Sequence, residues 1–294
     1  MVIFSLLLAL TLGTFGPEGR PFFQDIAQAD SSAILSIIIG GVIFNLSNIC
    51  LSASTSIAGM SVAFPVGCGL ALVLGVINNL RVEMSQGALK SNLTLLAIGV
   101  ALVVVAVILN GIASGKKAGN AEISKADQRK GIILAVVAGV VMSFFSSFVM
   151  KAMDLKDFAN MEPGKVGPYT AIVVFSLAVL VSHFVFGPIF MKWPFQGAPV
   201  KMREYFKGNS KTHLVGMLGG CIWCLGTALS YIAAGKAGAS VSYALGQGAP
   251  MVAAIWGVFV WKEFKGSNKT VYNLLGMMFL FFIVGLGMIV AAGM

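Results

Sequence analysis

Charged residues are scarce in this chain, and their scarcity excludes a soluble globular protein. Asp, Glu, Lys and Arg make up 11% of the 294 residues, whereas about 25% is usual in soluble domains. Hydrophobic residues make up 57% of the sequence, and the mean hydropathy is +0.91. Because a water-facing surface needs charged side chains, most of this chain must face lipid.

Acidic residues are the scarcer charged class, and the formal net charge is +9. Such an excess is common in nucleic-acid-binding proteins, but the sequence has no basic stripe with interleaved aromatic residues. The cations form short clusters between apolar runs, where they set membrane orientation and meet anionic lipid headgroups. We therefore expect the lipid bilayer as a partner and no nucleic acid. The sequence indicates no oligomeric state.

Residues that bind metals or act as nucleophiles are also few. Four cysteines lie in apolar runs: Cys50, Cys68, Cys221 and Cys224. The CxxC pair at 221 and 224 lacks the second Cys or His pair of a zinc site, so we expect packing residues and no metal. The histidines, His183 and His213, lie in different segments without a catalytic motif. An intramembrane enzyme is therefore disfavoured, and no cofactor is expected.

Long charge-free apolar stretches are what the sequence does contain. A transmembrane helix needs ~20 mostly apolar residues. Eight stretches satisfy this length: residues 33–55, 59–80, 93–114, 131–150, 168–191, 214–234, 237–261 and 271–292. We expect very short turns around residues 57–59 and 235–236. A further apolar run, residues 1–14, is too short to span. A secretory signal is disfavoured because no Lys or Arg precedes the run and because the run belongs to the internal repeat described next.

Several motifs recur at a constant offset, which indicates an internal duplication. Residues 40–46 (GGVIFNL) match 219–225 (GGCIWCL), and residues 58–62 (AGMSV) match 237–241 (AGASV), both at an offset of 179. Upstream, residues 4–6 and 15–17 match 175–177 and 186–188 at an offset of 171. On this alignment the second copy holds five helices, whereas the first holds three and a partial one.

These repeats predict an all-α polytopic membrane protein built as an inverted repeat of five-helix units. Relative to a ten-helix parent, the first helix is expected to be missing, which leaves eight full spans plus a partial one. The predicted divisions are residues 1–114 for the first repeat, 115–130 for a central loop and 131–294 for the second repeat. An odd helix number inverts the second copy, as in many secondary transporters that alternate access around a central site.

The loop charges predict an orientation. Alternation of the spans places seven Lys and Arg residues on one side and thirteen on the other, including those of the central loop. The positive-inside rule then places the loop 115–130 in the cytoplasm and Met294 outside. We expect an integral protein of the bacterial inner (cytoplasmic) membrane.

Two motifs carry a resemblance to a known family. Residues 45–76, and above all AGMSVAFPVG at 58–67, resemble the third and fourth helices of the ureide permeases, within the drug/metabolite transporter superfamily. Residues 245–250 (LGQGAP) resemble their ninth helix and are similar to the neighbouring glucose/ribose porter and rhamnose transporter groups. The resemblance covers nearly the whole chain. It implies uptake of a small neutral polar solute, a sugar or a ureide or nucleobase-like compound, with coupling to H⁺ or Na⁺ left open. The short central loop lacks the phosphate-binding Gly-Lys-Ser/Thr motif of the plant members.

Intramembrane polar residues are the candidate substrate site, because a polar group in lipid costs several kcal/mol unless it is paired or faces a cavity. Aromatic and amide side chains together suit a sugar face or a planar ureide. Interhelical hydrogen bonding and ordinary packing are the alternatives for each residue. The predicted substrate-binding set is Asn45, Asn48, Ser143, Ser147, Trp223, Thr227, Tyr243 and Gln247.

Some residues could form a hinge for movement of the helices. Pro65 breaks the helix hydrogen-bond ladder near Gly67 and Gly69, which predicts an interrupted helix or hinge, with an ordinary proline kink as the alternative. The duplicate positions are Gly246 and Gly248.

Titratable groups are rare inside the spans. His183 is the ionisable residue well inside one, so it is a candidate proton relay; a neutral, hydrogen-bonded histidine is the alternative. Glu83 and Glu263 are expected at helix ends, which disfavours cation/proton antiport. An exporter of drugs, metabolites or amino acids from the same superfamily, and a non-transporting receptor or subunit, stay open as alternatives.

Overall fold

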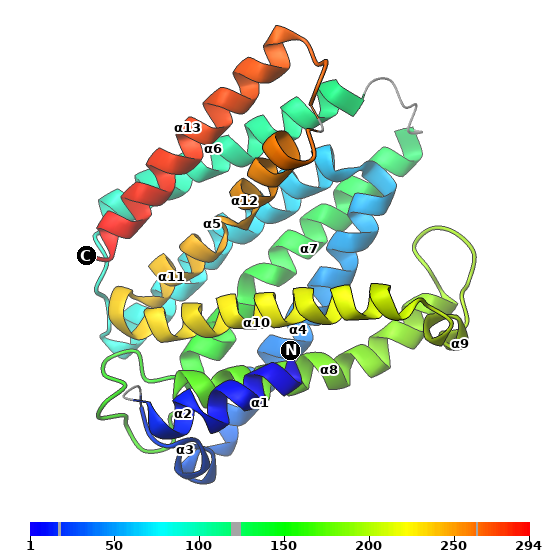
Figure 1. The fold of residues 1–294 in the computed structure, drawn as a ribbon. Helices are drawn as coiled ribbons and strands as arrows, with labels where there is room; N and C mark the ends of the chain where they lie inside the picture. The colour runs from blue at the N-terminus through cyan, green and yellow to red at the C-terminus, as the bar shows by residue number, and fades with distance from the viewer. Residues whose placement is uncertain (17–18, 119–124, 263) are drawn as a thin grey trace. The chain divides into compact units, whose positions relative to one another are not determined.

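A computed structural model of the chain describes residues 1–16, 19–118, 125–262 and 264–294, and these residues are helical almost throughout (Figure 1). Within these ranges no strand is assigned, and one isolated bridge pairs Met153 with Val166. In the described part of the chain, eight helical segments are long and apolar enough to cross a membrane. They are α4 (Ser31–Ala58), α5 (Met60–Gln86), α6 (Leu93–Ala118), α7 (Lys125–Ala152), α8 (Pro168–Lys192), α10 (Ser210–Ala237), the run of α11 (Ala239–Gly246), α12 (Ala249–Ile255) and η1 (Trp256–Val260), and α13 (Lys269–Ala292). The predicted all-α fold with eight full spans is confirmed.

Short helices occupy the N-terminal region and one long loop. They are α1 (Val2–Leu10), α2 (Leu12–Phe15), α3 (Phe22–Gln28) and α9 (Met202–Phe206). The apolar segment Val2–Phe15 is shorter than a membrane span, as the sequence predicts. Instead, α1 packs against α8 and α10, beside which it lies in Figure 1.

Two single-glycine turns separate consecutive spans. Gly59 (φ 79°) joins α4 to α5, and Gly238 (φ 93°) joins α10 to α11. Only glycine adopts such positive φ values without strain, so glycine is the natural residue at each turn. The prediction of the second turn at residues 235–236 is wrong, because those residues are still helical and α10 continues to Ala237.

The chain divides into two compact units that interleave in sequence. Unit 1 contains residues 1–46, 81–89 and 145–239, whereas unit 2 contains 47–80, 90–144 and 240–294. Each unit therefore draws segments from both halves of the predicted duplication. The predicted repeat boundaries are a different division, and they stay predictions.

Each unit has its own packed interior. In unit 1, Phe175, Tyr231 and Ile172 are fully buried among α1, α8 and α10. In unit 2, α6 and α13 run side by side (Figure 1). A Cβ added at Gly99 would lie 2.8 Å from the Gly285 carbonyl oxygen, and one at Gly285 would lie 2.9 Å from the Gly99 carbonyl oxygen. The two helices can pack this closely because both crossing positions are glycine.

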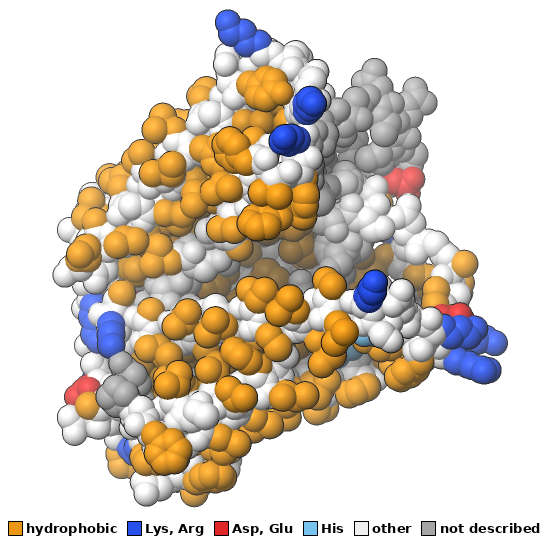
Figure 2. Space-filling view, in the orientation of Figure 1, with side chains coloured by type: hydrophobic (Ala, Val, Ile, Leu, Met, Phe, Trp, Pro, Cys, Tyr) orange, Lys and Arg blue, Asp and Glu red, His pale blue; other side chains and the backbone are white. Residues whose placement is uncertain are grey.

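Large apolar side chains are exposed along the spans, for example Ile222 at 64% and Leu218 at 60%. Figure 2 shows hydrophobic side chains over the faces of the helices, with Lys and Arg gathered at helix ends. This pattern inverts that of a water-soluble helix, whose exposed face is polar. Lipid is the solvent that such faces require.

Candidate substrate site

The predicted site residues fall into two sets of four, one in each unit. Unit 1 holds Asn45, Ser147, Trp223 and Thr227, and unit 2 holds Asn48, Ser143, Tyr243 and Gln247. Each unit therefore has its own set of candidate residues.

The amide of Asn45 is a buried hydrogen-bonding group in unit 1. Asn45 is 5% exposed, and its Nδ2 donates to Ser182 Oγ at 3.0 Å, which joins α4 to α8. Ser182 in turn donates to the Val179 carbonyl at 3.0 Å. Sequence reasoning missed Ser182, although a serine beside His183 inside a charge-free span was a usable signal.

An aromatic cluster contains Phe44, the residue that precedes Asn45 on α4. The Trp223 ring lies 4.8 Å from the Phe44 ring and 6.2 Å from the Phe175 ring, the latter nearly parallel at 21°. Phe145 meets Phe44 edge-on at 5.1 Å. Phe175 is fully buried, whereas Phe44 and Trp223 are half-buried. The cluster thus offers partly exposed aromatic surface, which can bind flat or sugar-like rings.

Other polar groups of unit 1 differ in their hydrogen bonding and burial. The Thr227 hydroxyl donates to the Trp223 carbonyl of its own helix at 3.0 Å. Ser147 is half-buried on α7. The Tyr231 hydroxyl is buried and has no hydrogen-bond partner among the described residues. Sequence reasoning missed Tyr231, which lies at the repeat offset of 179 from Ser52. An unmade buried hydrogen bond costs about 1–3 kcal/mol, so a polar ligand group could satisfy this hydroxyl.

Amide and hydroxyl groups also meet in unit 2. Asn78 Nδ2 donates to the carbonyl oxygen of the buried Ser143 at 3.2 Å and to its Oγ at 3.3 Å, which joins α5 to α7. Ser143 Oγ donates to the Val140 carbonyl at 2.7 Å. Asn78 was missed, although two adjacent amides inside the predicted span 59–80 were a usable signal.

Tyr243 anchors α11 on α5. Its side chain is buried, and its hydroxyl donates to the Ala71 carbonyl at 3.0 Å. A Cβ added at Gly75 would overlap the Tyr243 ring, so the ring packs directly on the glycine backbone. These contacts give Tyr243 a packing role, whatever further role it has toward a solute.

The helix near Gln247 is broken. α11 ends at Gly246 and α12 begins at Ala249, and Gln247 lies half-buried in the turn between them. The Gln247 N–H donates to the Ala244 carbonyl at 3.1 Å, and the Gly248 N–H to the Leu245 carbonyl at 2.9 Å. Broken spans free backbone groups for solutes and ions.

The segment around Pro65 differs from the break at Gln247. α5 continues through Pro65 and Gly69 as one helix. Gly67 is a packing position: a Cβ there would lie 2.7 Å from Leu51, and one at Gly139 would meet the Gly67 carbonyl. The hinge assignments stay predictions.

The exposure of three polar residues in the spans, Asn48, His183 and Glu83, could not be predicted from their position in the sequence. Asn48 is exposed although Asn45, one turn earlier on α4, is buried. His183 is exposed on α8. Glu83 lies near the end of α5, as expected, but it is fully buried. Glu263 lies outside the described residues.

Glu83 packs against the turn between α10 and α11, where a Cβ added at Gly238 would lie 3.0 Å from Glu83 Oε1. This burial was missed because Arg81 and the helix end suggested a solvated carboxylate.

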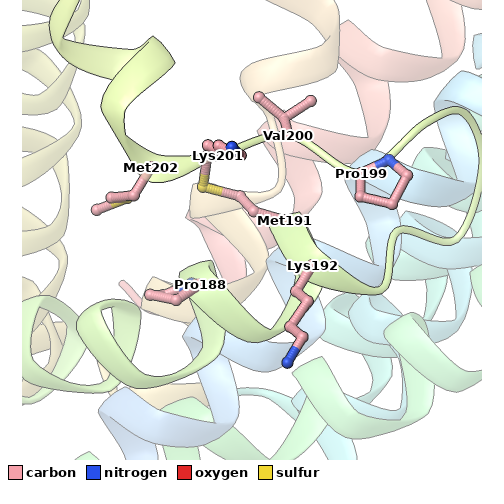
Figure 3. A pocket seen from close by; sticks show the side chains of 7 residues that line it. All are labelled: Pro188, Met191, Lys192, Pro199, Val200, Lys201 and Met202. Atoms are coloured by element: carbon pink, nitrogen blue, oxygen red, sulfur yellow. The ribbon is translucent and has the colours of Figure 1, made fainter.

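A pocket of about 440 Å³ lies in unit 1 at the C-terminal end of α8 (Figure 3). It is lined by Pro188, Met191, Lys192, Pro199, Val200, Lys201 and Met202. None of the predicted substrate-binding residues lines this pocket. In the described part of the chain, no group of three or more His, Cys, Asp and Glu residues could hold a metal ion, and each cysteine is a thiol.

Comparison with known proteins gives a consistent result. The sequence model of the ureide permease family matches residues 1–130 and 121–292. Ureide permease 1 of Arabidopsis thaliana is 25% identical over 345 aligned residues, which cover 98% of this chain and 85% of the plant protein. Ureide permease 2 of the same plant is 22% identical over 98% of this chain and 86% of its own length. An L-rhamnose-proton symporter of Yersinia pestis is 26% identical over 45% of this chain and 39% of its own length. No solved structure matches the chain.

Proposed function

Since the family match spans nearly the whole sequence, this chain belongs to the ureide permease family, and we propose that it takes up a small neutral polar solute by alternating access. The observation that carries the proposal is this match over residues 1–130 and 121–292. The relatives with known roles are permeases and a proton symporter, so the chain is a membrane transporter and not an enzyme.

The chemistry of the buried polar groups favours a neutral solute. Inside the described spans these groups are amides and hydroxyls, Asn45, Asn79, Ser143 and Ser182 among them, apart from the carboxylate of Glu83. A charged solute would need a buried group of opposite charge at its site, because an unpaired charge in the membrane interior is costly. Amides and hydroxyls instead donate to and accept from carbonyl, N–H and hydroxyl groups.

The aromatic cluster favours a flat or sugar-like ring. The rings of half-buried Phe44 and Trp223 lie 4.8 Å apart, and Phe44 directly precedes the buried Asn45 on α4. A planar ureide or nucleobase could stack on such rings, and a sugar could place its apolar face there. The names of the two kinds of relative, ureide permease and L-rhamnose-proton symporter, support the same two classes of solute. The second name also supports proton coupling over sodium coupling.

Matching turn geometry supports the duplication on which alternating access rests. Gly59 and Gly238, which are related by the offset of 179, both adopt positive φ. Each N–H donates to the carbonyl four residues earlier, at 3.0 Å from Gly59 to Thr55 and 3.1 Å from Gly238 to Ala234. Inverted repeats of this kind expose one site to the two sides of the membrane in turn.

Uptake into proteoliposomes tests the proposal. The purified chain would be supplied with radiolabelled allantoin, uracil, L-rhamnose or glucose, with or without an inward proton gradient, against empty liposomes. We expect saturable, gradient-stimulated accumulation of at least one of these neutral solutes and exchange of the same solute across equilibrated membranes. Absence of flux for all four, together with flux of a cationic drug or an amino acid, would overturn the neutral-solute proposal in favour of an exporter.

A further inference from the structure

The loop between α8 and α10 carries a concentrated positive charge. Residues 192–211 contain five Lys and Arg residues and a single carboxylate, Glu204. Lys207 Nζ pairs with Glu204 at 2.7 Å. Lys192 Nζ lies 4.6 Å from the centre of the Trp193 ring. Lys201, Arg203 and Lys211 form no ion pair with the described residues. Three cations are therefore available for an external anion.

This loop is folded, so its backbone stays near the end of a span. The Val200 N–H donates to the Met191 carbonyl at 2.9 Å, which brings the chain back beside the end of α8. The Phe190 and Phe195 rings stack at 5.0 Å. At the other end, Asn209 caps α10 by accepting from the Lys211 N–H at 2.9 Å.

The same loop also carries apolar surface. Trp193 is 65% exposed, and Phe206 is 74% exposed. Exposed aromatic residues flanking a span are typical of the membrane–water interface, where the ring sits among lipid headgroups. The pocket of about 440 Å³ lies in the same loop, with Pro188 and Met191 on the α8 side and Val200 on the returning chain (Figure 3).

We propose that residues 188–211 form a binding site for an anionic phospholipid of the adjacent leaflet. Lys201, Arg203 and Lys211 meet the headgroup phosphate, and an acyl chain segment occupies the apolar pocket. The charge selects the lipid class, because each Lys or Arg near the surface contributes about 1 kcal/mol toward an anionic leaflet. The pocket and the aromatic residues favour a lipid over a soluble anion, which has no acyl chain to bury. This site is independent of the transported solute.

Quenching of Trp193 fluorescence tests the site without any transport assay. The protein used is a variant in which Trp193 is the single tryptophan, because Phe replaces Trp223, Trp256 and Trp261. In mixed vesicles of phosphatidylglycerol and phosphatidylcholine, brominated acyl chains are placed on one lipid or the other at equal mole fraction. We expect stronger quenching by brominated phosphatidylglycerol, and a smaller difference at high salt because ions screen the headgroup charge.

Charge variants decide which residues select the lipid. Lys201→Gln, Arg203→Gln and Lys211→Gln combined should lower the preference for phosphatidylglycerol by at least about fivefold, the equivalent of one lost surface cation. The matched control, Lys262→Gln with Lys265→Gln and Lys269→Gln, removes three cations of another loop and should leave the preference unchanged. Glu204→Gln should raise the preference.

Three results would overturn the proposal: equal quenching by the two lipids, an unchanged preference in the triple variant, or competition by millimolar inorganic phosphate. If the single-tryptophan variant does not fold, native mass spectrometry can count the phosphatidylglycerol molecules retained on the chain with its four tryptophans. The charge variants are then compared by that count.

Discussion

The carboxylate of Asp25 accepts a hydrogen bond from the backbone N–H of Gly167 at 2.8 Å, across 142 positions of sequence. Asp25 lies on the short helix α3, and Gly167 directly precedes α8. Arg20 supports the same link, because it lies 3.6 Å from Asp25 and donates to carbonyl oxygens of Met161 and Lys165. The segment that leads into α4 is thereby fastened to the loop between α7 and α8.

A first prediction concerns how Asp25 responds to pH. Burial raises the pKa of Asp25 above its ordinary value, and hydrogen bonds from Thr170 and Gly167 and the charge of Arg20 offset this only in part. Because the folded-state pKa exceeds the unfolded one, the contribution of this group to stability is fully present below the unfolded pKa of about 3.9. It is lost as the pH rises through the raised folded pKa.

Asp25→Asn cannot ionise, so its melting temperature should rise relative to that of the wild-type chain as the pH increases above about 4. Asp157→Asn, in an exposed loop, is the control and should show a smaller change. Thermal melts of detergent-purified protein across this range would measure the difference. A difference between Asp25→Asn and wild type that stays constant with pH would contradict the raised pKa.

A second prediction concerns the contact between Gly75 and Tyr243. Gly75→Ala places a methyl group where the Tyr243 ring lies, so overpacking should cost about 1–3 kcal/mol of unfolding free energy. Gly69→Ala is the matched control on the same helix, since no atom outside its own helix turn lies within 4 Å of the added Cβ. That control should be neutral or stabilising, because alanine favours helix by up to about 1 kcal/mol over glycine. Chemical unfolding of both variants measures the contrast, and equal stability would refute the packing contact.

The spans could be predicted from the sequence because a charge-free run of adequate length is a strong and local signal. All eight predicted runs overlap observed helical spans, and α4 extends the predicted run 33–55 by only a few residues at each end. The second turn was placed at residues 235–236 because Gly235 and Lys236 look like a loop. The repeat offset from Gly59 leads instead to Gly238, where the turn lies.

The candidate site was harder to predict, because it depends on contacts between helices. Asn45 and Asn48 are equivalent by spacing, but among the described residues Asn45 is buried against Ser182, on a helix more than a hundred residues away, whereas Asn48 is exposed. Similarly, nothing local marks Asn78 as the partner of Ser143. Periodicity shows which residues share a helix face, but not which other helix that face meets.

A third prediction tests the aromatic cluster and the Asn45 amide of unit 1 as parts of the solute site. Trp223→Ala and Asn45→Ala should each lower kcat/KM for uptake by about tenfold or more, the equivalent of one lost stacking contact or buried hydrogen bond. Trp223→Phe should keep most activity because it keeps an aromatic face. Ile222→Ala, next to Trp223 and 64% exposed, is the control and should transport normally.

Gln247→Ala and Asn48→Ala extend this test to unit 2. We expect a higher KM with little change in protein stability, because Gln247 lies in a turn and Asn48 is exposed. Initial rates in proteoliposomes, measured with the solute identified there, give both constants. Unchanged kinetics in Trp223→Ala and Asn45→Ala would remove the unit 1 cluster from the solute site. Unchanged kinetics in Gln247→Ala and Asn48→Ala would remove those two residues.

A fourth prediction concerns orientation in the membrane. Thirteen of the twenty Lys and Arg residues fall on the side where α6 ends and α7 begins, so the positive-inside rule predicts that this side faces the cytoplasm. In a background without Cys50, Cys68, Cys221 and Cys224, single cysteines at Lys116, Lys207, Lys236 and Gly293 can be labelled with a membrane-impermeant maleimide. Intact bacterial cells should label the cysteines at 236 and 293 and protect those at 116 and 207.

The number of spans between two labelled positions determines whether they lie on the same side of the membrane. Positions 116 and 207 are separated by α7 and α8, so they must share a side, whereas α10 places 236 on the opposite side. Positions 236 and 293 are separated by the α11–η1 run and α13, so they also share a side. Permeabilised cells should label all four cysteines and so show that each is reactive. The reverse pattern in intact cells would overturn the charge-based orientation but keep the spans. Labelling of 207 together with 236 would instead show that α10 does not cross the membrane.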